Sequence, residues 1–287
     1  MARHPAPDHV EWSSVTVRGR RVCYAAGGAG IPVVFIHGWA LGNRSYKRAL
    51  KRLIQLGCSV HAPALPGFGG SSELPGRSPD LRGHAAWLAD FMDAVGVGRP
   101  ALVVGHSLGG AVAARLAHDH PDRVARLVLI NAVGAAVWKE AAGEVRYLAE
   151  RPIWEWVADF SRDMATTDGL GSALRAIVED AVPNVARNPA GVWRAAGLAR
   201  RVDLRRELES IAAGGPPVTA ISSEGDLVVP AASFRALCRS LGVDGRLVPG
   251  RHSWLLGRPD TFGAVMADVL AAAGPAPGPT LLPAANQ

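Results

Sequence analysis

Short apolar segments alternate with longer amphipathic segments along most of this chain. Apolar segments such as Pro32–Ile36 and Ala101–Val104 have the length of strands, and the amphipathic segments between them carry apolar residues at helical spacing. Strands that are apolar throughout and that alternate with helices are typical of a mostly parallel sheet covered by helices on both faces. The alternation therefore predicts an α/β fold.

The pattern predicts about eight strands, of which the first two form a hairpin. The expected strands are Val15–Val17, Arg21–Tyr24, Pro32–Ile36, Ser59–Ala62, Ala101–Val104, Arg126–Ile130, Val218–Ile221 and Arg246–Val248. The expected helices between and after them are Ser45–Leu56, Leu81–Val95, Leu108–His118, Ala231–Leu241 and Pro259–Ala272.

The alternation stops after the sixth expected strand. Residues 134–209 have a helical pattern, which predicts a helical cap inserted into the sheet domain. Residues 10–133 and 210–273 then form the core, and residues 1–9 and 274–287 are expected to be flexible ends, since the second is rich in Pro and Gly.

Composition and charge exclude several classes of protein. The chain has 287 residues, 48% hydrophobic and 20% charged, as in ordinary globular proteins. Its net charge of +6 comes with no nucleic-acid-binding motif, and the basic cluster between Arg44 and Arg52 follows one face of an expected helix. We therefore expect a solvated surface and no nucleic-acid partner.

The termini and cysteines bear on location and metal content. No apolar run reaches the length of a membrane span, and no apolar stretch follows the first residues as in a secretory signal. We expect a cytoplasmic protein that is not integral to a membrane. Cys23, Cys58 and Cys238 are far apart, which argues against both a zinc cluster and a disulfide framework.

One motif indicates nucleophilic catalysis. Gly105-His106-Ser107-Leu108-Gly109 has the form G-x-S-x-G and lies between an expected strand and an expected helix. A nucleophile elbow needs that strand–turn–helix arrangement, because the sharp turn exposes the serine hydroxyl above the sheet. Glycines on either side let the neighbouring backbone approach closely. We predict that Ser107 is a nucleophile.

A serine nucleophile needs a base and an acid that orients the base. Of nine histidines, His252 fits best, since it follows the expected strand Arg246–Val248. Asp226 follows the strand Val218–Ile221, and the chain order Ser, Asp, His is that of α/β-hydrolases. Glu224 is an alternative acid, with Asp226 favoured.

An oxyanion hole requires two main-chain N–H groups. Leu108, the residue after the nucleophile, supplies one, and the loop His37-Gly38-Trp39 supplies the other, expected at Trp39.

Together these segments resemble the serine α/β-hydrolase family, in particular its small, lidded, bacterial esterase-like members. The resemblance rests on the elbow and on four further motifs, which are His37-Gly-Trp39, Leu65-Pro-Gly-Phe-Gly-Gly-Ser71, Gly225-Asp-Leu-Val-Val-Pro230 and Gly250-Arg-His-Ser-Trp254. It covers about residues 10–272. Where the family usually carries Asp before the second motif, this chain has Ala64, and we expect a local change in that loop with intact chemistry.

The resemblance implies hydrolysis of a carboxylic ester through an acyl-enzyme, with Ser107, Asp226 and His252 as triad and no metal or organic cofactor. The expected partner is a small-molecule ester or related acyl substrate. Two alternatives stay open: hydrolysis of a carbon–carbon bond in a ring-cleavage dienoate, and ligand binding without turnover. Members with peroxide chemistry share the same triad.

The substrate pocket is expected beneath the cap. Its candidate residues are aromatic, which suggests an apolar or aromatic substrate, although the same tryptophans could simply attach the cap to the core. The candidates are His37, Trp138, Trp154, Trp156 and Trp254.

Overall fold

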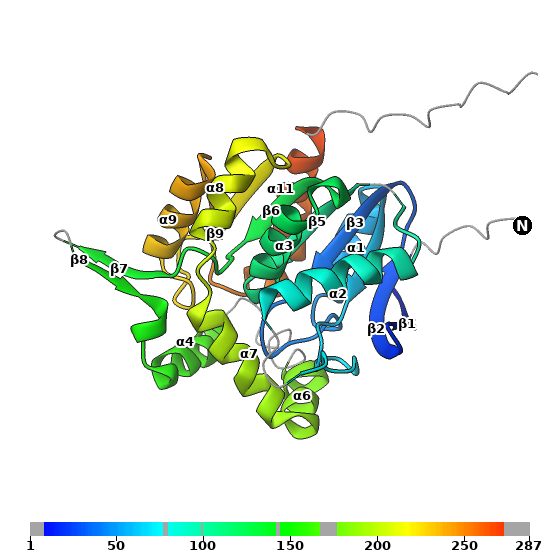
Figure 1. Ribbon diagram of the computed structural model, residues 1–287, viewed down its shortest axis with the longest axis horizontal. Coiled ribbons are helices and arrows are strands. Elements are labelled where there is room, and N and C mark those ends of the chain that lie inside the picture. The colour runs from blue at the N-terminus through cyan, green and yellow to red at the C-terminus, as the bar shows by residue number, and fades with distance from the viewer. Residues whose placement is uncertain (1–8, 77–79, 99, 142–143, 167–176, 273–287) are drawn as a thin grey trace, which may run out of the picture.

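The computed structural model describes residues 9–76, 80–98, 100–141, 144–166 and 177–272. Its centre is an eight-stranded sheet in the order β1-β2-β4-β3-β5-β6-β9-β10 (Figure 1). Of the predicted flexible ends 1–9 and 274–287, all residues except His9 lie outside the described residues. The predicted α/β fold with a mostly parallel sheet is confirmed.

All eight predicted strands are present, most of them a residue or more longer than expected. They are β1 (Glu11–Val17), β2 (Arg20–Gly27), β3 (Ile31–Ile36), β4 (Cys58–Pro63), β5 (Ala101–His106), β6 (Val124–Ile130), β9 (Val218–Ser223) and β10 (Arg246–Val248). The β1–β2 hairpin and the β2–β4 pair are antiparallel, and the other neighbours are parallel. The carboxyl ends of the parallel strands therefore meet at one edge.

Helices cover both faces of the sheet because its central strands are apolar on both faces. In β5, Val103 packs in one buried cluster while Leu102 and Val104 pack in the other, as the alternation of side chains along a strand requires. The first face carries α2 (Leu81–Ala94), α3 (Leu108–Asp119), α8 (Arg205–Gly214) and α9 (Ala231–Leu241). The second carries α1 (Lys47–Gln55), α10 (Trp254–Gly257) and α11 (Pro259–Ala271).

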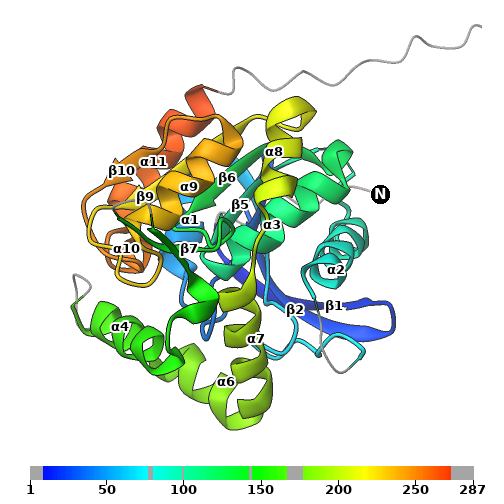
Figure 2. The ribbon, with the colours of Figure 1, turned by 60° about the vertical axis from the view of Figure 1, so that its left-hand side comes forward.

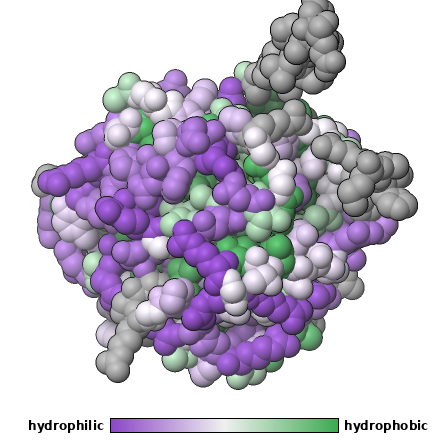
Figure 3. Space-filling model, turned by 45° about the vertical axis from the view of Figure 1, so that its right-hand side comes forward, coloured by the Kyte–Doolittle hydropathy of each residue, from purple (hydrophilic) through white to green (hydrophobic). Residues whose placement is uncertain are grey.

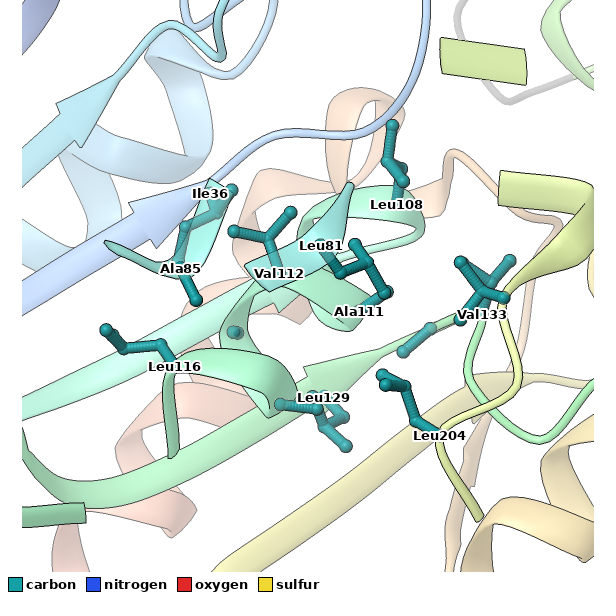
Figure 4. Packing of buried hydrophobic residues seen from close by; sticks show 14 of the residues in the cluster. Ile36, Leu81, Ala85, Leu108, Ala111, Val112, Leu116, Leu129, Val133 and Leu204 are labelled. Carbon is teal, nitrogen blue, oxygen red and sulfur yellow. The ribbon is translucent and has the colours of Figure 1, made fainter. Parts of the chain in front are cut away.

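The helix α3 lies at the centre of the first buried cluster. Figure 4 shows Val112 and Leu116 of α3 among Ile36 of β3, Ala85 of α2 and Leu129 of β6, all of which are buried. This packing holds the amino end of α3, and with it Ser107, against the carboxyl edge of the sheet.

The segment that follows β6 forms a cap at one end of the sheet. Its helices α4 (Ile153–Thr166), α6 (Val182–Arg187) and α7 (Pro189–Arg201) lie side by side in both ribbon views (Figures 1 and 2). The segment also contains an antiparallel pair, β7 (Val137–Ala141) and β8 (Glu144–Tyr147), which the helical pattern did not predict. These strands are short, so no run of alternating residues was long enough to indicate them.

The surface agrees with a solvated exterior. On the face in Figure 3, hydrophilic side chains dominate and hydrophobic ones gather in a small central area. In α1, Lys47, Arg48 and Lys51 are exposed, while Leu50 and Leu53 are buried. Among the described residues, no helix is both long and apolar enough to cross a lipid bilayer.

Candidate active site

Ser107 lies in a strained turn between β5 and α3. Its backbone has φ 55° and ψ −120°, a conformation that residues with a side chain rarely adopt. A Cβ atom at Gly105 would lie 2.4 Å from the carbonyl oxygen of Gly109, and one at Gly109 would lie 2.4 Å from that of Ile36. Both positions therefore require glycine, as a nucleophile elbow does.

His252 and Asp226 meet at the carboxyl edge of the sheet. The Nδ1 atom of His252 lies 2.9 Å from Oδ2 of Asp226, and each side chain is only 2% exposed. Because the carboxylate can only accept, Nδ1 carries the proton and Nε2 is left with a lone pair. Burial lowers the pKa of His252, but the charge and hydrogen bond of Asp226 outweigh it, so the net pKa is raised above 6.5.

The remaining acceptor capacity of Asp226 is taken by the surrounding backbone and by an amide. Its Oδ1 accepts the main-chain N–H groups of Val228 and Val229, both at 2.8 Å. Its Oδ2 also accepts from Nδ2 of Asn131 at 2.6 Å. These contacts hold the carboxylate in one orientation toward His252.

The role of Asn131 was missed in the sequence. Asn131 is fully buried after β6 with φ 45°, and besides binding Asp226 it accepts a hydrogen bond from Nε1 of Trp254 at 2.9 Å. A single Asn after a strand carries no signal for such a role. The only hint in the sequence is that Asn is one of the residues that tolerate positive φ in turns.

The loop after β3 is fixed by a buried chain of hydrogen bonds. The N–H of Gly38 donates to the hydroxyl of Tyr46 at 3.1 Å, and that hydroxyl lies 2.7 Å from Nδ1 of His106. The Nε2 atom of His106 lies 3.0 Å from the carbonyl oxygen of His252, which can only accept. His106 therefore carries its proton on Nε2, and Tyr46 donates to its Nδ1.

Two further histidines in the loops of the candidate site, His37 and His106, are buried and neutral. Burial lowers the pKa of His37 and, with the nearby His252, holds the pKa of His106 well below its ordinary value. The Nε2 atom of His37 accepts the N–H of Leu65 at 2.8 Å, and its Nδ1 donates to the carbonyl of Gly38. Its two ring nitrogens thus join the loop after β3 to the loop after β4, next to the buried Ala64.

The candidate pocket residues do not all come together. Trp156 is buried and stacks on Trp39 with ring centroids 6.1 Å apart, and Phe160 contacts Trp39 from the side. Trp254 lies in the core cluster of α1 and α11. Trp138 is buried in β7 beneath basic side chains, whereas Trp154 is 71% exposed. Trp154 precedes the buried Trp156 by two residues in α4, so its side chain lies on the opposite, solvent-facing side of the helix.

The described residues also bear on metal binding. In the described part of the chain, no group of three or more His, Cys, Asp or Glu side chains is placed to hold a metal ion. The three cysteines are free.

The chain matches a known protein family over most of its length. A family model described as the alpha/beta hydrolase fold matches residues 31–242. The match includes Ser107 and Asp226 and ends before His252.

Individual relatives carry related names. The chain is 34% identical, in an alignment of 257 residues that covers 83% of this chain and 97% of the relative, to a pimeloyl-(acyl-carrier protein) methyl ester esterase of Aromatoleum aromaticum. It is 26% identical, over 90% of its length and 93% of the relative, to a putative non-heme haloperoxidase of Mycobacterium phage D29.

A solved esterase from Thermogutta terrifontis has the same fold. Its TM-score is 0.68 at 21% identity, covering 92% of this chain and 99% of that one. At that identity the likeness concerns the fold alone.

Proposed function

The chain belongs to the alpha/beta hydrolase fold family, and on that basis we propose that it is a serine hydrolase that cleaves carboxylic esters of small apolar or aromatic substrates. Ser107 is the nucleophile, His252 the base and Asp226 the orienting acid. One observation carries the proposal: the buried contact of 2.9 Å between His252 and Asp226 leaves Nε2 of His252 as a free base at the carboxyl edge of the sheet, where Ser107 also lies.

Acylation follows from these roles. The Nε2 atom of His252 takes the proton of Ser107 as Oγ attacks the ester carbonyl carbon, and the resulting imidazolium is stabilised by Asp226. The negative charge on the carbonyl oxygen is held by the N–H groups of Leu108 and Trp39, each contributing roughly 3 kcal/mol. His252 then gives its proton to the leaving alcohol as the C–O bond breaks.

Deacylation repeats the sequence with water. His252 removes a proton from water, hydroxide adds to the acyl carbon, and the proton passes to Oγ of Ser107 as the acid leaves. Besides the substrate and water, this cycle uses only side-chain and main-chain groups of the protein.

The acyl group is proposed to lie beside the stacked rings of Trp39 and Trp156. Trp156 comes from the cap, and its Nε1 donates to the carbonyl of Val228 at 2.9 Å, so the ring is held between the cap and the acid loop. Apolar aromatic walls favour an apolar acyl chain. The Aromatoleum relative, named as a methyl ester esterase, supports a small alcohol as the leaving group.

The test is a screen of p-nitrophenyl esters of graded chain length, with one ring-cleavage dienoate beside them. The wild-type protein is expected to hydrolyse the esters and to be labelled at Ser107 by a fluorophosphonate. Ser107→Ala is expected to lose both while keeping its melting temperature. Ester hydrolysis that survives in Ser107→Ala would contradict the proposal, and preference for the dienoate would favour carbon–carbon hydrolysis.

A further inference from the structure

A cap carboxylate holds the loop that carries the candidate base. Asp163 lies on α4 and its side chain is fully buried. Its Oδ1 accepts the main-chain N–H of His252 at 2.6 Å, and its Oδ2 accepts that of Ser253 at 3.0 Å. One carboxylate thus binds two consecutive N–H groups of a loop that lies 89 residues further along the chain.

These two bonds complete the set that holds His252. The side chain of His252 is oriented by Asp226, and its carbonyl oxygen accepts from Nε2 of His106. The main-chain N–H of His252 is bound by Asp163, which leaves ring Nε2 as the group available to act as the base. The core therefore orients the imidazole ring of His252, whereas the position of the His252 main chain depends in part on the cap.

A carboxylate without solvent contact is costly unless hydrogen bonds compensate it. Asp163 meets that requirement through charge-assisted bonds to the base loop, which are stronger than those between neutral groups. Other polar contacts of the cap hold neighbouring loops: Asp180 binds Ser45, and Asn184 bridges Gly69 and Ala40. Asp163 is the contact that reaches the base itself.

We propose that Asp163 is a positioning residue for the base, so that the cap is part of the catalytic apparatus as well as a cover for the substrate. The inference rests on the proposed function, because it assigns His252 as the base. Loss of Asp163 lets the main chain of His252 move, and a displacement of about 1 Å can cost about 100-fold in rate.

Asp163 also acts on the charge of the imidazole. Among the described residues, the ionisable groups facing His252 are Asp226 from the acid loop, His106 from the elbow and Asp163 from the cap, with Arg151 of the cap near Asp226. Burial lowers the pKa of His252, and Asp226 raises it. The charge of Asp163 raises this pKa further. Its removal therefore lowers the pKa of the base.

The experiment compares Asp163→Asn with Asp180→Asn. The second variant is a matched control, because Asp180 is also a buried cap carboxylate but binds Ser45 instead of the base loop. Rates of p-nitrophenyl butyrate hydrolysis and of fluorophosphonate labelling are measured against pH, together with the melting temperature of each protein.

We expect Asp163→Asn to lower kcat by about 10- to 100-fold, with a smaller change in KM, and to move the acid limb of the pH profile to lower pH. In Asp180→Asn the melting temperature falls but the acid limb stays in place. A folded Asp163→Asn protein with the wild-type acid limb and at least half of the wild-type kcat would overturn the inference.

A measurement on the wild-type protein covers the case in which Asp163→Asn does not fold. In hydrogen–deuterium exchange, the amides of His252 and Ser253 are expected to be protected to the same degree as those of α4. Exchange at the rate of an exposed loop would overturn the inference. If the wild-type protein neither hydrolyses esters nor reacts with the fluorophosphonate, the proposed function fails, while the exchange result still reports whether the cap holds the loop.

Discussion

The Tyr46 hydroxyl offers the sharpest test of the buried hydrogen-bond chain behind the candidate oxyanion hole. Tyr46 is fully buried, and its ring packs 5.1 Å from that of Phe35. Its hydroxyl accepts from Gly38 and donates to His106. Tyr46→Phe keeps the ring and removes only the oxygen, so the change isolates the two hydrogen bonds.

The expected cost follows from the two partners left behind. In Tyr46→Phe the N–H of Gly38 and Nδ1 of His106 both lose a partner in a site without water contact, and each unpaired group costs about 1–3 kcal/mol. The expected loss in the free energy of unfolding is therefore about 2–6 kcal/mol, a large part of the total stability of a domain. For a chain of this size the melting temperature falls by roughly 4–10 °C.

The same variant also perturbs the proposed catalysis. Gly38 precedes Trp39, whose N–H is a proposed oxyanion donor, so a shift of this loop lowers kcat by about tenfold or more. The assays are urea denaturation and p-nitrophenyl butyrate hydrolysis.

The control is Tyr24→Phe, since the half-buried Tyr24 packs on Phe91 and its hydroxyl makes no hydrogen bond within the described part of the chain. A Tyr46→Phe protein that loses less than about 1 kcal/mol and matches Tyr24→Phe in rate would refute the reasoning.

Two further predictions concern the base and the elbow. The pKa of His252 is raised above 6.5, and the neutral imidazole is the active form. The value of kcat/KM, measured with an ester from pH 5 to 9, is therefore expected to fall as the pH drops through a midpoint above 6.5. A flat profile would count against a His base. Gly109→Ala places a Cβ atom 2.4 Å from the carbonyl oxygen of Ile36 and is expected to lower the free energy of unfolding by about 1–3 kcal/mol or more in urea titrations. A Gly109→Ala protein with the wild-type free energy of unfolding would contradict this prediction, because the backbone would then have moved to accommodate the Cβ atom at little cost.

Features that depend on neighbours in sequence could be predicted well. The elbow at Ser107 needs one strand, one turn and one helix in succession, and the structure has all three with the strained backbone that such a turn requires. The eight strands were visible because apolar runs of β length recur between helical patterns. The short pair β7–β8 was missed, since too few residues alternate to distinguish it from a helix.

Contacts between residues far apart in the sequence could be predicted only in part. Asp226 and His252 each follow a strand, and the carboxyl ends of parallel strands converge at one edge, so their contact was foreseeable. The pocket candidates were chosen by residue type alone, and a tryptophan in an amphipathic helix can face either way. Trp156 faces the core and Trp154 faces solvent.

The eight strands of the main sheet, the family and the three loops that carry the candidate triad could be read from the sequence alone, because each depends on a contiguous motif with a local physical cause. The contacts that hold those loops in place became visible only in the folded protein. Tyr46, Asn131 and Asp163 lie 60, 95 and 89 residues from the partners they bind, and nothing in their immediate neighbours indicates those contacts. Such polar pairs form only when the packed fold removes both groups from water. Each group must then hydrogen-bond to the other, because buried polar groups are almost always hydrogen-bonded.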